Sequence, residues 1–469
     1  MHKAFGQFKK ALLVCTGLFI FPFVLVAQEG FVQERIADIQ YKYELGSIDL
    51  EYAVSKQYQI IFETAETLHD HPQEKCLTPA FMFLHEHKNK LNAKEKATLE
   101  NERATKLSAN RNESEQRYTS PSGKFEIIYY TSGIDSVSIV DEDENGVPDY
   151  IDRVAEAADS SYRHQVVNIG FTDPIPEGEL YRVYVEETDG VYGFTAPSSS
   201  APGGTYIVVH SNFNGFPKNN HPKGNQIGAI YATMAHEFKH SIQYVQNNWR
   251  SPSGGFNWTE MDATLMEEVV YDNVNDYYNY IKTNFDADRP HESSIFHDPT
   301  DGTPGAYYHV SWMIFYSEYF GNDVWQEVWQ EIELENNLSI DDALRRILPN
   351  RGTTFGSSFV LNHLWHYASG PRQGSDSFGF DEKAFYPYAN VEDTLSGLPA
   401  AGIEINSIQR LAAEYYEVIP SLSDEGFVNI AVDFDTTQVG LGMILYMKNG
   451  EMLEFHDIGE DKPQVYIPT

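Results

Sequence analysis

The apolar and polar positions along the chain separate a helical first part from a central part that mixes strands and helices. Before about residue 106, short apolar stretches such as 58–62 and 81–84 stand among many charged residues, a pattern typical of helices. The polar run from Ser108 to Ser122 interrupts this pattern and is interpreted as a linker. Runs rich in β-branched and aromatic residues follow and predict three strands, at 125–130, 180–185 and 205–209.

The strongest helical pattern lies between residues 226 and 248. A further helix is predicted at 151–168, and the chain stays mostly helical to about residue 370. Beyond about residue 396, the pattern predicts short strands at 427–432 and 443–446. In the strongest helix, apolar side chains recur at three- and four-residue steps, which is the spacing of one buried helix face: Ile227, Ile230, Tyr231, Met234, Phe238, Ile242 and Val245.

Together these elements predict an α+β fold built from consecutive segments. With 41% hydrophobic and 14% aromatic residues, the 469-residue chain can bury a substantial core and is expected to divide into more than one domain. The expected segments are a signal peptide (1–27), a helical N-terminal region with a linker (28–118), a central catalytic domain (119–395) and a small β-sandwich-like domain (396–469).

The charge of the chain argues against a nucleic-acid partner. Lys and Arg number 33 against 69 Asp and Glu, which gives a formal net charge of −36. A phosphate-binding surface needs clustered basic residues, and this composition hardly supplies them.

The first 27 residues have the pattern of an export signal. Three lysines among the first ten residues precede an apolar run from Ala11 to Ala27, and the polar Gln28 follows. We expect cleavage after Ala27 and a secreted mature protein without a membrane segment. The alternative is an uncleaved membrane anchor, for which the apolar run is marginally long.

A zinc site is predicted from the segment Met234–His240. His236 and His240 are four residues apart, so on a helix both imidazoles point from one face, as two ligands of one tetrahedral zinc require. Glu237 lies beside them and could take a proton from a zinc-bound water. The alternative is a histidine pair on the surface or in the core of an amphipathic helix.

The third zinc ligand is expected on the helix that Trp258–Thr264 begins. Glu260 follows His240 after nineteen residues, an order that resembles the gluzincin zinc peptidases. Glu267, seven residues further on, shares nearly the same helix face and could orient a ligand imidazole through a hydrogen bond. The reverse assignment, with Glu267 as the ligand and Glu260 as its support, stays open.

Three protein ligands would leave zinc one position for water, whose pKa zinc lowers towards 7, so Glu237 could act as the general base of peptide hydrolysis. A hydrogen-bond donor to the developing oxyanion is sought in Gly305–His309, where we favour Tyr308 over the alternative of a tyrosine packed in the core. The strand 206–210, just before the zinc helix, is expected to form the sheet edge on which an extended peptide lies.

The acidic segment 141–152 fits the template of a calcium-binding loop over its whole length. Oxygen-bearing side chains fall at template positions 1, 3, 5, 9 and 12, position 7 offers its backbone carbonyl, and Gly146 allows the sharp turn. We therefore expect a structural Ca²⁺, against the alternative of a solvated acidic turn. Its ligands would be Asp141, Asp143, Asn145, Val147, Asp149 and Asp152.

Four segments occur in an order that resembles the MXAN-type metalloproteases, secreted bacterial proteins assigned to the zinc peptidases largely by motif. The resemblance covers residues 120 to about 420, and it implies a zincin-like catalytic fold. It gives the zinc roles to His236, Glu237, His240 and Glu260. The four segments are Asn145–Tyr150, His236–His240, Trp258–Thr264 and Phe359–Pro371.

Cys76 is the only cysteine left after removal of the signal, and it precedes the linker. A lone thiolate in a pro-region can fill the open position of a zinc and keep an enzyme latent until the pro-region is removed. The alternative is a buried apolar cysteine.

The sequence as a whole predicts a secreted zinc metallopeptidase, with Zn²⁺ and structural Ca²⁺ as cofactors, that cleaves peptide bonds inside protein or peptide substrates. The alternative from another class is a secreted binding or adhesion protein that keeps the same scaffold without turnover.

Overall fold

The computed structural model describes most of the chain between residues 32 and 468. The predicted signal peptide lies outside the described residues. Also outside are residues 28–31, 63–73, 102–113, 189, 251–256, 286–294, 296–306, 308, 336–337, 375–377, 397–407, 420–426, 432–438, 447–451, 456–463 and 469.

Helices make up the N-terminal part and the region between residues 225 and 370, as the sequence pattern predicts. The helix expected at 151–168 is α5 together with the π-helical turn Arg163–Ile169. The helices are α1 (Val32–Glu44), α2 (Leu50–Phe62), α3 (Thr78–Glu86), α4 (Ala93–Leu99), α5 (Asp149–Tyr162), α6 (Asn225–Asn247), α7 (Asn257–Val270), α8 (Tyr278–Phe285), α10 (Val310–Phe320), α11 (Asp323–Leu334), α12 (Ile340–Ile347) and α13 (Phe355–Tyr367). Among the described residues, no helix combines the length and the apolar character needed to cross a bilayer.

Strands gather in the central part and at the C-terminal end. The strands expected at 125–130, 180–185 and 205–209 are confirmed as β3, β4 and β6, and those expected near 427 and 443 as β9 and β10. The strands are β1 (Glu74–Cys76), β2 (Glu115–Thr119), β3 (Phe125–Tyr130), β4 (Tyr181–Glu186), β5 (Val191–Pro197), β6 (Thr205–His210), β7 (Asp393–Ser396), β8 (Tyr416–Ile419), β9 (Phe427–Ala431), β10 (Met443–Tyr446), β11 (Met452–Phe455) and β12 (Gln464–Pro468).

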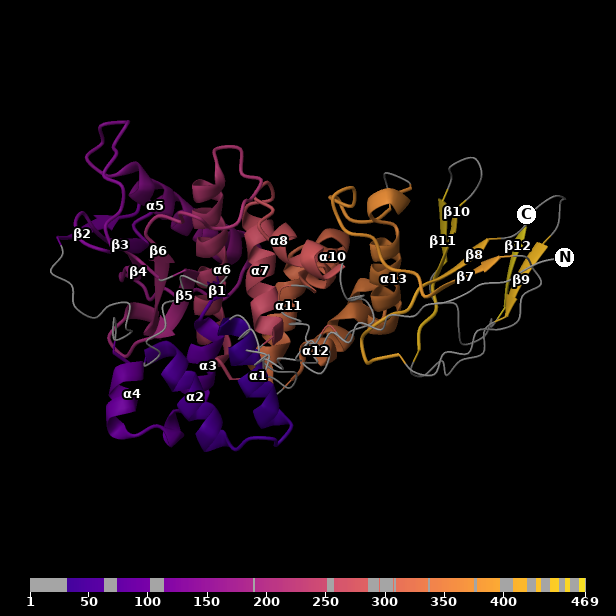
Figure 1. Ribbon diagram of the computed structural model, residues 1–469, viewed down its shortest axis with the longest axis horizontal. Coiled ribbons are helices and arrows are strands. Elements are labelled where there is room, and N and C mark those ends of the chain that lie inside the picture. Colours follow the sequence, from indigo (N-terminus) through magenta and orange to yellow (C-terminus); the bar gives the residue numbers. More distant parts are fainter. Residues whose placement is uncertain are drawn as a thin grey trace, which may run out of the picture. The chain divides into compact units, whose positions relative to one another are not determined.

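Six strands form one mixed sheet in the order β1-β5-β6-β4-β3-β2 (Figure 1). Strands β6, β4 and β3 are parallel to one another, whereas β5 and β2 are antiparallel to their neighbours β6 and β3. The short strand β1 pairs parallel with β5. The architecture is therefore α+β with a mixed sheet.

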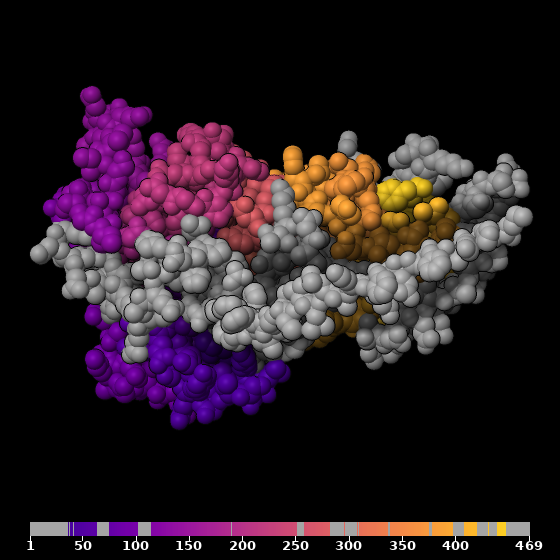
Figure 2. Space-filling view, in the orientation of Figure 1, coloured from indigo at the N-terminus to yellow at the C-terminus, as the bar shows by residue number. Residues whose placement is uncertain are grey.

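Helices cover both faces of this sheet. Successive residues of a strand point to opposite faces, so neighbouring residues pack against different helices. Ile127 and Val183 belong to a core that includes residues of α5, α6 and α7. Their neighbours Ile128 and Tyr184 belong to a second core with residues of α1, α2 and α3. Figure 2 shows the indigo residues of these N-terminal helices gathered on one side of the molecule. The N-terminal region is thus part of the packing of the sheet.

The C-terminal strands form three pairs among the described residues. Strands β7 and β8 are parallel, and the pairs β10–β11 and β9–β12 are antiparallel. The strands themselves agree with the sequence pattern, and their assembly into a β-sandwich-like domain stays a prediction.

The prediction that strand 206–210 forms an edge of the sheet is wrong, because β6 lies between β5 and β4. Strand β5 is not predicted from the sequence pattern. Its sequence, Val-Tyr-Gly-Phe-Thr-Ala-Pro, contains Gly and Pro, which are depleted in strands. The outer strands are not predicted for other reasons: β1 is only three residues long, and β2 is a polar, mostly exposed strand within the run interpreted as a linker.

Gly193 lies in the middle of β5, where α6 passes close to the sheet. A Cβ atom at this position would lie 2.6 Å from the carbonyl oxygen of Val208 and 2.7 Å from Cγ2 of Thr233, closer than real Cβ atoms approach. The same Cβ would lie 3.4 Å from Cγ of Glu237. The absence of a side chain therefore lets α6 bring Glu237 directly against β5.

We predict that Gly193→Ala lowers the free energy of unfolding by about 1–3 kcal/mol, because the added methyl group forces α6 and β5 apart in a close-packed core. Urea or thermal unfolding of the metal-free protein measures the change. Gly356→Ala, on the exposed first turn of α13, is the matched control: its Cβ would meet only Thr354 Oγ1, at 4.0 Å. The control should be neutral or slightly stabilising. Equal losses in both variants would contradict the close-approach argument.

Candidate metal centre

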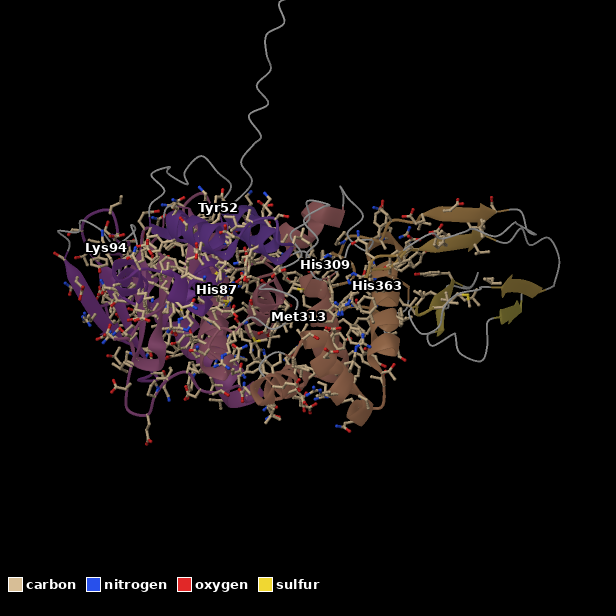
Figure 3. All side chains as sticks on the ribbon, turned by 90° about the horizontal axis from the view of Figure 1, so that it is seen from below. Tyr52, His87, Lys94, His309, Met313 and His363 are labelled. Atoms are coloured by element: carbon tan, nitrogen blue, oxygen red, sulfur yellow. The ribbon has the colours of Figure 1, made fainter. Side chains whose placement is uncertain are left out.

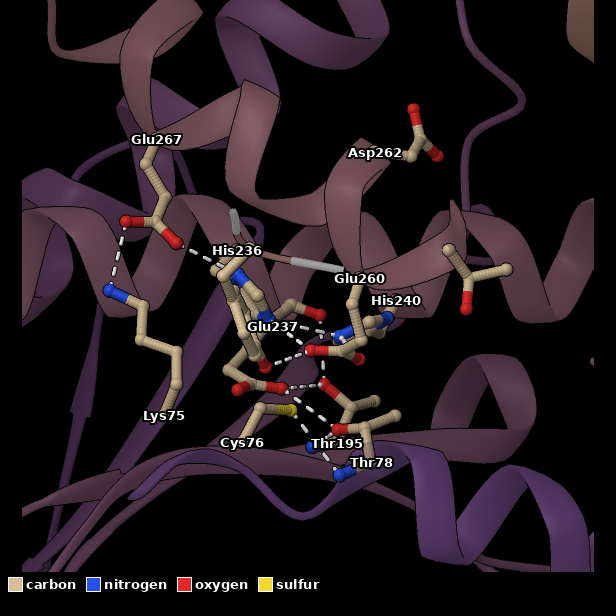
Figure 4. Close-up of polar contacts among 12 residues, drawn as sticks. Lys75, Cys76, Thr78, Thr195, His236, Glu237, His240, Glu260, Asp262 and Glu267 are labelled. Atoms are coloured by element: carbon tan, nitrogen blue, oxygen red, sulfur yellow. Dashed lines mark hydrogen bonds and ion pairs between the residues drawn. The ribbon is translucent and has the colours of Figure 1, made fainter. Parts of the chain in front are cut away.

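Four buried side chains from three elements meet at the middle of α6 (Figure 4). α6 presents His236 and His240 one turn apart, α7 presents Glu260 in its first turn, and β1 ends in Cys76. One ligand atom of each residue lies within 4.8 Å of the ligand atoms of the other three. The spacing predicted from the sequence therefore places both imidazoles on one helix face, and a thiol joins them from the N-terminal region.

The distances inside this group suit a small cation. The two Nε2 atoms of His236 and His240 are 3.1 Å apart, and the carboxylate oxygens of Glu260 lie 3.3 and 3.0 Å from them. Ligand arms of about 2.1 Å around tetrahedral zinc place neighbouring ligand atoms roughly 3.4 Å apart. Two nitrogens, one carboxylate and one sulfur are all atom types that zinc binds.

Acceptors behind the two imidazoles fix their orientation. His236 Nδ1 lies 2.8 Å from a carboxylate oxygen of Glu267, and His240 Nδ1 lies 2.8 Å from the amide oxygen of Gln243. The amide nitrogen of Gln243 donates to Thr259 O and Asp262 Oδ2, so its oxygen must face His240. Each Nδ1 therefore faces an acceptor on the outside, and each Nε2 atom points into the group, an arrangement typical of metal-binding histidines.

The charges around His236 favour a cation at this place. Burial alone lowers the pKa of His236, but hydrogen bonds and charges from Glu260 and Glu267 outweigh it and raise the pKa to about 10. The pKa of Glu260 shifts the opposite way: its burial is outweighed by the two histidines, and the pKa falls well below its usual value. A site that stabilises positive charge against the cost of burial can hold a divalent ion between the same groups. The residues present therefore fit zinc.

Glu237 lies next to the metal group with one of its oxygens uncommitted. Its Oε2 accepts hydrogen bonds from the hydroxyls of Thr195 and Thr78, at 2.9 and 3.1 Å. Its Oε1 is buried and has no hydrogen-bond partner among the described residues. This oxygen is available to accept a proton or to bind a ligand.

A buried lysine holds Glu267 in place, and the sequence pattern did not single it out. Lys75 Nζ lies 2.9 Å from Glu267 Oε2 and 2.5 Å from Asp276 Oδ2, with all three side chains almost completely buried. Burial lowers the pKa of Lys75, but the two carboxylates outweigh it and raise the pKa above its usual value. Lys75 therefore stays charged and keeps Glu267 turned towards His236. Its position directly before Cys76 is the only local signal that could have pointed to it.

The two candidate glutamates occupy different places. The carboxylate of Glu260 lies within the group of ligand atoms, whereas that of Glu267 lies behind His236 on its Nδ1 side. These contacts favour Glu260 as the third metal ligand and Glu267 as the group that orients an imidazole.

Tyr308 lies outside the described residues, and its neighbour Tyr307 reaches the metal group. The hydroxyl of Tyr307 donates to Glu260 Oε2, and its ring stacks over that of His236 with the centroids 6.3 Å apart. Burial, together with the charge of Glu260, raises the pKa of Tyr307 well above its usual value, so it remains a donor. The segment Gly305–His309 thus contributes a residue that the sequence analysis did not choose.

The acidic loop brings three of its expected calcium ligands together. One carboxylate oxygen from each of Asp141, Asp143 and Asp149 lies within 4.8 Å of the other two. Gly146 adopts a φ of 88°, the left-handed conformation that the sharp turn at this position requires. The loop ends at the start of α5, which places Asp149 in the first helical turn.

Asn145 is hydrogen-bonded to the two other expected ligands, Val147 and Asp152. Asn145 accepts from the amide of Val147 at 2.7 Å through its side-chain oxygen, and its amide nitrogen donates to Asp152 Oδ2 at 2.9 Å. The side-chain oxygen of Asn145 is therefore engaged within the loop, and Asp152 approaches through Asn145.

Another group of buried histidines lies between the start of α10 and α13, where Figure 3 labels His309 and His363. Burial lowers the pKa of His363 to about 3 and that of His366 well below its usual value, so both rings are neutral at neutral pH. Within the described part of the chain, these histidines do not form a converging group of three metal ligands. The segment Phe359–Pro371 therefore contributes mainly to the core.

Metal titration of ligand variants separates the two glutamates. His236→Ala, His240→Ala and Glu260→Ala should each abolish stoichiometric zinc binding at micromolar protein. Glu267→Gln should keep one zinc per chain but bind it about 10–100-fold more weakly, because the orienting hydrogen bond is altered and the ligand atoms remain. Competition with a chromophoric chelator measures both effects. A larger loss in Glu267→Gln than in Glu260→Ala would reverse the two roles.

Neither a scan against protein-family models nor a search of curated proteins returns a match for this chain. The argument for function therefore depends on the geometry of the metal centre.

Proposed function

We propose that the chain is an exported zinc-dependent peptidase that cleaves bonds within protein or peptide substrates. The observation that carries the proposal is the convergence of two oriented imidazoles and the carboxylate of Glu260 beside the uncommitted oxygen of Glu237. This combination of a cation site and an adjacent buried base supports hydrolysis of a bond as stable as an amide.

In this proposal, His236, His240 and Glu260 would hold the zinc ion, which would supply an acidified water molecule and a charge that polarises the substrate carbonyl. Glu237 accepts the proton through Oε1 and passes it to the leaving amine. Thr195 holds Oε2 by a hydrogen bond, so the carboxylate cannot rotate freely. Glu267 and Gln243 keep the imidazoles oriented.

Tyr307 supports the ligand set, because its hydroxyl is already committed to Glu260. We keep Tyr308 as the proposed donor to the substrate carbonyl oxygen, since the chain holds it next to a residue that reaches the site.

A binding or adhesion protein is the second candidate, and one observation favours it. The thiol of Cys76 belongs to the same group of ligand atoms, and four protein ligands are typical of structural zinc, whereas catalytic zinc keeps one position open. Activity measurements therefore need a form of the chain without this thiol.

The decisive measurement is peptide hydrolysis by zinc-loaded protein, with casein as the substrate. We expect chelator-sensitive cleavage, in the wild-type chain or in Cys76→Ser. Glu237→Gln in the active background should lower the rate about 10²–10⁴-fold while zinc stays bound, because the variant loses the proton acceptor and no metal ligand. Glu156→Gln, at an exposed position of α5, is the matched control and should leave the rate unchanged. Stoichiometric zinc without cleavage in either background would support the binding protein instead.

We also propose that the loop 141–152 binds a structural calcium ion. The agreement of the loop with the ligand template, together with the convergence of Asp141, Asp143 and Asp149, supports this proposal. A bound ion would neutralise carboxylates that otherwise repel one another at the start of α5.

Calcium should raise the thermal unfolding midpoint of the protein. At 100-fold excess over its dissociation constant, a ligand specific for the folded state adds about 2.7 kcal/mol to the free energy of unfolding. The shift should be lost in Asp141→Asn/Asp143→Asn and kept in Asp38→Asn, an exposed aspartate of α1 whose carboxylate pairs with Lys42 at 2.6 Å. An unchanged midpoint in the wild-type chain, at millimolar calcium, would count against the site.

A further inference from the structure

Residues 75–78 reach the metal centre from a part of the chain far from α6 in sequence. Three of these residues contact three different parts of the site. Lys75 pairs with Glu267, the Sγ atom of Cys76 lies among the ligand atoms, and Thr78 donates to Glu237. Figure 4 shows these side chains approaching from the side opposite α7. One short segment thus contacts the residue that orients His236, the group of ligand atoms and the proposed general base, Glu237.

The pairing of β1 places the thiol. Cys76 is in register with Gly193 of the neighbouring strand β5, the residue whose missing side chain lets Glu237 approach the sheet. Cys76 therefore stands opposite a position of β5 where Thr233 and Glu237 of α6 approach closely. The backbone amide of Thr78 donates a hydrogen bond of 3.2 Å to the sulfur of Cys76, which helps to fix the position of the sulfur beside the ligand group.

Strand β1 also occupies the edge of the sheet next to the metal centre. Without β1, the outermost strand there would be β5. The hydroxyl of Thr78 accepts a hydrogen bond of 2.7 Å from the backbone amide of Thr195 in β5 and donates to Glu237 Oε2. The segment therefore uses the donors of β5 that an added strand would need.

We propose that Lys75–Thr78 is a built-in plug, in which the sulfur of Cys76 is the fourth ligand of the zinc and keeps the full-length chain latent. This proposal rests on the proposed function. Departure of the plug opens the fourth ligand position, releases Glu237 from its hydrogen bond with Thr78 and exposes the edge of β5. The substrate class that fits the vacated edge is an extended polypeptide, which can pair with β5 as β1 does.

Zinc-edge X-ray absorption of the full-length, zinc-loaded chain tests the ligand assignment without any activity measurement. The wild-type spectrum should contain one sulfur scatterer at about 2.3 Å together with nitrogen and oxygen ligands. Cys76→Ser should lose this sulfur shell while one zinc per chain remains. In parallel, hydrolysis of casein by Cys76→Ser should exceed that of the wild type by at least about tenfold.

Leu77→Ala is the matched control, because Leu77 is a buried neighbour that packs in the core with α1–α3 and not in the metal group. It removes apolar contacts beside Cys76 but keeps the sulfur, so both its spectrum and its hydrolysis should resemble those of the wild type. Thr78→Val removes the hydroxyl from Glu237 and Thr195, and should raise hydrolysis less than Cys76→Ser does while keeping the sulfur shell.

A wild-type spectrum without sulfur would overturn the plug, and so would equal hydrolysis by the wild type and Cys76→Ser. If those equal rates still depended on Glu237, the proposed function would stand without the plug. Activation by Leu77→Ala to the level of Cys76→Ser would show that loosening of the strand, and not the thiol, controls the site. Absence of hydrolysis in every form, with the sulfur shell present, would instead remove the proposed function and leave a closed structural zinc site.

Discussion

The contact on which the rest of the centre depends is the approach of two imidazole nitrogens to 3.1 Å. Because Glu267 and Gln243 lie against the outward Nδ1 atoms, the two Nε2 atoms face each other across the group. Two such acceptors repel at this distance unless positive charge lies between them. Glu260 adds a third acceptor. The arrangement of α6, α7 and β1 therefore gathers groups that are suited to surround a cation.

The position of α6 on the sheet is the second constraint. Helix α6 can place Glu237 against β5 only because Gly193 offers no side chain at the point of closest approach. The same point of β5 faces Cys76 across the strand pairing. A single small residue thus sets the distance between the helix that carries the histidines and the strand edge that carries the thiol. Packing of the sheet and geometry of the metal group are therefore not independent.

Local sequence patterns predict one part of this centre, whereas the other part forms only through contacts between distant segments of the chain. The four-residue spacing of His236 and His240 is a property of one helix, so periodicity predicts it. Glu260 is predicted from its place in the chain, after the two histidines and at the start of the next predicted helix. Lys75, Thr78 and Thr195 join the site only after β1 pairs with β5, and no local pattern reports a pairing across more than a hundred residues. The sequence pattern also predicts the sheet edge wrongly at 206–210, because β5 contains Gly and Pro and is not predicted as a strand.

Ion pairs explain how β1, which carries the charged Lys75, can be buried beside the metal group. Buried charges are costly unless they are paired, and Lys75 is paired with both Glu267 and Asp276 at 2.9 and 2.5 Å. If Cys76 binds a cation as thiolate, β1 brings one positive and one negative group into the site together, so its arrival or departure leaves the net charge of the centre unchanged. Its departure does leave two carboxylates without their lysine, and that cost holds the segment in place. The pairing of Lys75 with both carboxylates would therefore hold β1 in place, and a cation bound by the group could release the segment by exchanging the sulfur for another ligand.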